Sequence, residues 1–210
     1  MERRKFLRLA AGAASVLLAA CGGGAQSSAP PSSAAPAKPS AAAAPSSPAA
    51  AASALSSAAA KSPASPAAKE ADTAILKGAI DIEHQAIWTY KAAAGTKLLQ
   101  KPVLDVAVVF LGQHEQHRDA LSDAVTRLGG KPAQTKDKYD LPELKTQNDI
   151  LAFAVKLEDT AAKAYVDAVA KLADRELAKA AASVGIVEGE HASILRQALG
   201  QPPVPAAFVA

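Results

Sequence analysis

The 210-residue chain contains a single cysteine, so no disulfide can form within it. Its N-terminal apolar run, which ends at Val16-Leu17-Leu18, is too short to span a membrane comfortably. Excess positive charge is confined to residues 1–69, which carry seven Lys/Arg and one acid, whereas the other 141 residues carry 16 basic and 19 acidic side chains. Because this larger part is slightly acidic, the basic pI indicates no nucleic-acid partner.

Residues 1–21 are typical of a targeting signal. Arg3 and Arg4 open a basic segment whose pattern resembles a twin-arginine signal, the export route for proteins that fold in the cytoplasm. The segment ends in Leu18-Ala19-Ala20-Cys21, which resembles a bacterial lipobox. We expect lipid attachment at Cys21, the alternative being an incidental thiol. The predicted location is extracytoplasmic, in the periplasm or cell envelope, with a lipid anchor that does not span the membrane.

Residues 22–69 consist almost wholly of Ala, Ser, Pro and Gly, and Leu55 is the only large apolar residue among them. Such a composition cannot bury enough apolar surface to offset the entropy of ordering. We therefore predict a disordered linker over 22–69, one folded domain over 70–200 and a tail over 201–210 without a clear role.

The folded domain carries four stretches in which apolar residues recur every three or four positions, the spacing of a helix with one buried stripe. The predicted helices run over about 70–94, from Lys101-Pro102 to before Gly129, and over about 147–173 and 175–199. Gly95 is predicted as the residue that ends the first helix, and Thr146 and Asp174 as the N-caps of the third and fourth. The fifteen residues 131–145 are a connection that can reach roughly 50 Å when extended, enough to cross a bundle.

An internal repeat places ligand-type residues at the middle of all four stripes. The first and third helices each carry Glu and Tyr seven residues apart, and the second and fourth carry a pair three residues apart. These residues are Glu83 and Tyr90, His114 and His117, Glu158 and Tyr165, and Glu188 and His191. Residues three apart share a helix face. A two-fold superposition of the halves would bring the six glutamates and histidines to one level of the core.

Taken singly, a glutamate on a helix is usually a solvated surface residue, and a buried histidine is usually hydrogen-bonded packing. Six such residues on four buried stripes do not fit a surface role. Burying even one carboxylate without compensation is very costly, and a cation supplies that compensation. Glu115 lies about 200° from His117 around its helix, and His84 lies about 100° from Glu83, so neither belongs to the predicted set.

With this pattern, residues 72–199 resemble the ferritin-like superfamily, specifically bacterial ferritin-like domains that often follow twin-arginine signals. The resemblance implies an all-α, antiparallel four-helix bundle with a long connection between its second and third helices. It also implies two metals. Glu83 and Glu158 would be terminal carboxylates, His117 and His191 imidazole ligands, and Glu188 a bridging carboxylate. Tyr90 and Tyr165 would lie nearby as hydrogen-bonding or radical-capable groups, their alternative role being core aromatics with a solvated hydroxyl.

One residue departs from the family pattern. His114 stands where the family has its second bridging glutamate. The six residues then carry a charge of −3 instead of −4, and an imidazole cannot bridge as a carboxylate does. The set could hold two unequal metals, or one metal with some residues outside its ligand shell. Iron is favoured, and manganese, zinc and copper also suit this mixture of imidazole and carboxylate.

Three functions remain open from the sequence. The leading hypothesis is Fe(II) oxidation or peroxide consumption, a ferroxidase-like activity. The second is a metal-holding or stress-related scaffold without turnover. The third is a degenerate bundle that binds a partner. A homodimer is compatible with each.

Overall fold

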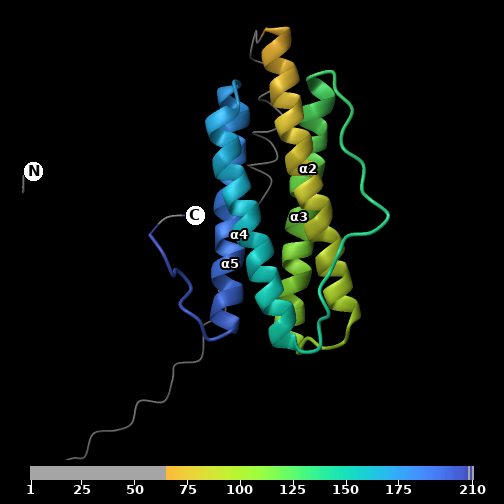
Figure 1. Ribbon diagram of the computed structural model, residues 1–210, viewed down its shortest axis with the longest axis vertical. Coiled ribbons are helices and arrows are strands. Elements are labelled where there is room, and N and C mark those ends of the chain that lie inside the picture. Colours follow the sequence, from red (N-terminus) through yellow and green to blue (C-terminus); the bar gives the residue numbers. More distant parts are fainter. Residues whose placement is uncertain (1–64, 208, 210) are drawn as a thin grey trace, which may run out of the picture. The chain divides into compact units, whose positions relative to one another are not determined.

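The computed structural model describes residues 65–207 and 209, which form four long helices (Figure 1). These are α2 (Pro66–Gly95), α3 (Lys101–Arg127), α4 (Gln147–Lys171) and α5 (Arg175–Ala198). The all-α bundle predicted from the sequence is confirmed. The predictions for the signal, for Arg3, Arg4 and Cys21, and for nearly all of the linker lie outside the described residues. Among the helices that the structure describes, none has the length and hydropathy that a membrane span requires.

Helix α2 begins four residues earlier than predicted. The hydroxyl of Ser65 accepts a hydrogen bond from the Ala68 amide at 3.2 Å, and Pro66 occupies the first turn. Proline is favoured at this position because its missing N–H would have no helical partner there. Residues 66–69, predicted as the end of the linker, therefore belong to the helix. The helix also ends differently from the prediction, because the left-handed residue after it is Lys97 (φ 60°) and not Gly95.

The other two predicted caps are confirmed. Thr146 and Asp149 form a reciprocal capping box at the start of α4. The Asp174 carboxylate accepts hydrogen bonds from the amides of Glu176 and Leu177 at the start of α5. Both caps supply acceptors to amides that have no partner within the helix.

The helices form two antiparallel pairs, α2 with α3 and α4 with α5, and contacts of α2 with α4 and of α3 with α5 close the bundle. The connection between α3 and α4 runs along the length of the bundle (Figure 1), as predicted from its length. It is held by the Tyr139 ring, 6.1 Å from that of Trp88, and by a contact of 3.3 Å between the Ala133 carbonyl and the ring of His84.

The core consists of two apolar clusters with a polar layer between them. One cluster contains Leu76 and Leu177 and the other contains Phe110 and Leu151. Along each helix the order is apolar, polar, apolar, so the antiparallel arrangement brings the four polar centres to one level. Polar residues at the middle of each buried helix face thus form a buried polar layer between two apolar clusters.

Asp72 ties α2 to the turn between α4 and α5. It is 1% exposed, and its two oxygens accept hydrogen bonds from the amides of Ala173 (2.8 Å) and Asp174 (3.0 Å). We expect Asp72→Ala to lower the free energy of unfolding by about 3 kcal/mol, because one buried and one partly buried amide lose a carboxylate acceptor. Urea denaturation measures this. The exposed Asp123→Ala is the control, expected within about 0.5 kcal/mol of wild type, and an equal effect of both variants would contradict the role of Asp72.

Candidate metal centre

All six predicted ligand residues are buried in the polar layer, and the structure brings them together. They are Glu83 on α2, His114 and His117 on α3, Glu158 on α4, and Glu188 and His191 on α5. They form two overlapping groups that could each hold a metal ion, and within each group the candidate ligand atoms all lie within 4.8 Å of one another. The role of these residues as ligands remains a prediction.

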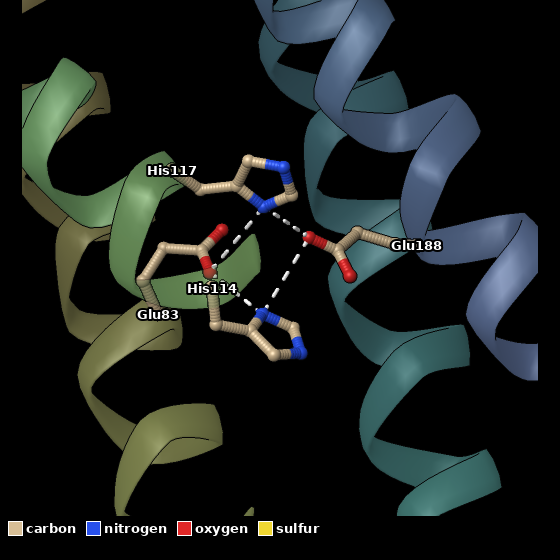
Figure 2. A group of neighbouring side chains, drawn as sticks. All are labelled: Glu83, His114, His117 and Glu188. Atoms are coloured by element: carbon tan, nitrogen blue, oxygen red, sulfur yellow. Dashed lines mark hydrogen bonds and ion pairs between the residues drawn. The ribbon is translucent and has the colours of Figure 1, made fainter. Parts of the chain in front are cut away.

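The first group contains Glu83, His114, His117 and Glu188, which point toward one another from three helices (Figure 2). The Nδ1 atom of His114 lies 2.8 Å from Glu83 Oε2. The Nδ1 atom of His117 lies 3.0 Å from Glu188 Oε1. This group therefore offers two carboxylates and two imidazoles to one point.

The second group contains His114, Glu158, Glu188 and His191. His114 Nε2 lies 3.3 Å from Glu158 Oε1, and His191 Nδ1 lies 3.1 Å from Glu188 Oε2. Two residues are shared between the groups. Glu188 directs one oxygen to each group, and His114 directs one ring nitrogen to each.

Three atoms of these groups are buried without a hydrogen bond: His117 Nδ1, Glu158 Oε2 and Glu188 Oε1. His117 Nδ1 and Glu188 Oε1 face each other as an ion pair at 3.0 Å, and Glu158 Oε2 lies 3.6 Å from His191 Nδ1. Unpartnered buried polar atoms are rare, and each needs a physical explanation. All three are lone-pair donors of the type that binds iron, zinc or manganese. The donor set therefore fits a metal ion, which would give each of these atoms the contact that no hydrogen bond supplies.

The two tyrosines support the carboxylates crosswise. The Tyr165 hydroxyl on α4 donates to Glu83 on α2, and the Tyr90 hydroxyl on α2 donates to Glu158 on α4. Burial, and then the nearby carboxylates, raise the pKa of both phenols well above the ordinary value. Both hydroxyls therefore stay protonated as donors, and they are not the solvated groups of the alternative interpretation.

Sequence reasoning missed the surroundings of His191. Its Nε2 donates to Gln113 Oε1 at 2.7 Å, and its ring stacks on Phe110 with centroids 3.9 Å apart. With Nε2 holding its proton for Gln113, Nδ1 is the nitrogen left to face the carboxylates. The signal in the sequence was weak: Gln113 lies four residues before His117, and hence on a similar face of the helix.

The two residues excluded on geometry do lie outside the groups. Glu115 forms an ion pair of 2.8 Å with Lys91 on the surface of the bundle. His84 faces the α3–α4 connection through its contact with Ala133. Angular position around the helix was sufficient to exclude both.

Charge pairing within the cluster outweighs desolvation. Burial alone would raise the pKa of Glu83 and lower that of His117, but contacts between the histidines and carboxylates bring the Glu83 pKa down to about 2 and the His117 pKa up to about 9. The pKa of Glu158 is lowered and those of His114 and His191 are raised by similar contacts. Without metal, imidazolium groups therefore neutralise the carboxylates.

This pairing predicts how pH affects the metal-free protein. The histidine contribution is complete below the unfolded pKa of 6.5 and is lost as pH rises through about 9. The Glu83 contribution is present above 4.5 and is lost as pH falls toward about 2. We expect the free energy of unfolding to be highest between these ranges, and to fall by more than about 1 kcal/mol between pH 6.5 and 9.5.

Urea denaturation of chelator-treated protein at several pH values measures this profile. A His84→Ala variant should keep it, because His84 lies outside the cluster. A stability that stays constant between pH 6.5 and 9.5 would contradict the paired histidines.

The sequence profile of a family described as "Ferritin-like domain" matches residues 71–201. The chain is also similar to the crystal structure of a conserved hypothetical protein from Mycobacterium tuberculosis, with 27% sequence identity and a TM-score of 0.56. That similarity covers 67% of this chain and 99% of the other. No curated protein sequence matches.

Proposed function

Since the chain belongs to the ferritin-like domain family, we propose that its bundle binds one or two metal ions, with iron favoured, and oxidises Fe(II) or consumes peroxide. The observation that carries the proposal is the set of three buried atoms without a hydrogen bond, which belong to the two candidate metal groups. An ion at each of the two positions would give all three atoms a partner.

The residues divide between two positions. Glu83 and His117 would hold one ion, Glu158 and His191 the other, and Glu188 would contribute one oxygen to each. A neutral His114 carries one proton on its two nitrogens, so only one nitrogen is free to bind. We therefore expect one tightly held ion and a weaker second one.

When bound, iron supplies the redox chemistry. The protein's own residues hold and shield the site. Tyr90 and Tyr165 orient Glu158 and Glu83, Gln113 keeps a proton on His191 Nε2, and the two apolar clusters exclude bulk water. As metal binds, the histidines release the protons that neutralise the cluster, so affinity should rise with pH.

The second candidate is a metal-holding or stress-related scaffold without turnover. It is favoured by His114, which removes one bridging carboxylate from the centre. The third candidate, a bundle that serves partner binding, would retain these groups only as self-neutralised ion pairs.

The deciding experiment measures metal content per chain after anaerobic loading with Fe(II), and separately with Mn(II) and Zn(II). A His117→Ala/His191→Ala double variant should lose the metal, while His84→Ala, a histidine outside the groups, should keep it. Iron retained in wild type, followed by oxygen or peroxide consumption, supports the redox function, and retention without turnover supports the scaffold. No metal in a folded wild-type protein would eliminate both and leave the partner-binding bundle.

Export and anchoring remain part of the proposal. They are supported by the Arg3-Arg4 pattern and by the lipobox that ends at Cys21. Detergent fractionation of cells that express wild type or Cys21→Ala tests them, because only lipidated protein should partition with membranes.

A further inference from the structure

A small apolar cavity lies beside the polar layer, at the end of the bundle that contains Tyr90. Its walls come from all four helices and include Tyr90, Val103, Ala154 and Leu195. Its volume is about 20 Å³, and the walls are formed almost entirely by carbon atoms. A space of this volume holds one molecule of about the size of water.

The polar groups of the cavity do not suit a water molecule. A buried water needs two to four polar partners. Thr89, a residue 3% exposed, lines the cavity and its hydroxyl has no hydrogen-bond partner, whereas the Tyr90 hydroxyl already donates to Glu158. One free hydroxyl in an apolar wall favours a small, weakly polar molecule over water.

The cavity shares Tyr90 with the candidate metal centre. Tyr90 forms part of the cavity wall, and its hydroxyl donates to Glu158. The same ring stacks against His114 with centroids 5.3 Å apart. A molecule in the cavity would therefore lie next to a residue that contacts both candidate groups.

We propose that this cavity binds dioxygen. Dioxygen is small, apolar and more soluble in apolar surroundings than in water, and it needs at most a weak contact such as the Thr89 hydroxyl provides. Binding requires no metal. Only the use of the bound gas as an oxidant rests on the proposed function.

Methyl NMR of the metal-free, full-length chain tests the binding with dioxygen itself as the probe. Dissolved dioxygen is paramagnetic and speeds the relaxation of nearby methyl groups. We expect enhancement at the methyls of Leu151 and Leu195, which line the cavity, to exceed that at Leu76 and Leu177, which are similarly buried in the opposite cluster, by at least about twofold. Equal enhancement in both clusters, or water cross-relaxation at Thr89 without a dioxygen effect, would overturn the proposal.

A filled cavity supplies the matched comparison. Ala154→Leu adds carbon atoms to the wall and should abolish the excess enhancement, with Ala107→Val as a milder filling if the first variant does not fold. Ala74→Leu makes the same chemical change at an exposed residue of α2 outside this cavity, and should leave the excess intact. An excess that survives in both filled variants contradicts the location.

Iron-loaded protein then separates the two proposals. If both hold, the filled variants should require several-fold higher dioxygen for half-maximal Fe(II) oxidation, with metal content unchanged. A positive NMR result without iron oxidation would retain the cavity and reject the redox function. Iron oxidation without the NMR effect would retain the redox function and reject dioxygen binding in the cavity.

Discussion

Glu188→Gln is expected to weaken metal binding at both positions, because Glu188 is the one carboxylate that both candidate groups contain. Its Oε1 lies 3.0 Å from His117 Nδ1 and its Oε2 lies 3.1 Å from His191 Nδ1. Glutamine keeps the shape but removes the negative charge and replaces one oxygen with an amide nitrogen that cannot bind a cation. Since changes that only orient a ligand already cost about 10- to 100-fold in affinity, we expect more than about 100-fold here.

Equilibrium metal titration measures this loss, and Glu83→Gln provides the contrast. Glu83 belongs to the first group only, so its loss should leave the ion held by Glu158 and His191. The control Glu190→Gln changes an exposed residue two positions away on the same helix and should bind as wild type does. If Glu188→Gln and Glu83→Gln lose equal amounts of metal, the overlapping arrangement is wrong.

The position of each ligand residue along its helix could be predicted from the sequence. Apolar residues recur at three- and four-residue steps on either side of Glu83 and of Glu158, so the glutamates had to share the buried stripe. The nearly equal offsets between the halves, 75 residues from Glu83 to Glu158 and 74 from His117 to His191, then placed the four helix centres at one level. These inferences need only helix geometry, which is local.

Features that depend on contacts between helices could not be predicted in this way. The hydrogen bond from His191 to Gln113 joins residues 78 positions apart, and that from the Ala173 amide to Asp72 spans 101. Both depend on the exact rotation of one helix about its axis relative to its neighbour. The spacing of apolar residues identifies only which face of a helix is buried. The start of α2 was missed for a different reason: Pro66 breaks a helix in its interior but begins one when Ser65 caps it.

His114 combines both kinds of feature. Its position on the buried stripe follows from its own helix, but its effect depends on the three carboxylates around it, which come from other helices. We expect His114→Glu to destabilise the metal-free protein by about 3–5 kcal/mol, since a buried cationic partner of Glu83 and Glu158 is replaced by a fourth acid. With metal, the order should reverse. A carboxylate can serve both ions, so the second ion should bind more tightly and stabilise the folded state.

Thermal unfolding with and without Fe(II) or Zn(II), together with metal titration, measures both effects. His114→Gln separates charge from shape, because it removes the cation without adding an acid, and it should destabilise the metal-free protein without strengthening the second ion. Unchanged stability in His114→Glu without metal would show that His114 is not the partner of the buried carboxylates. If instead the variant behaves as expected, His114 stabilises the metal-free centre and lowers its affinity for a second ion.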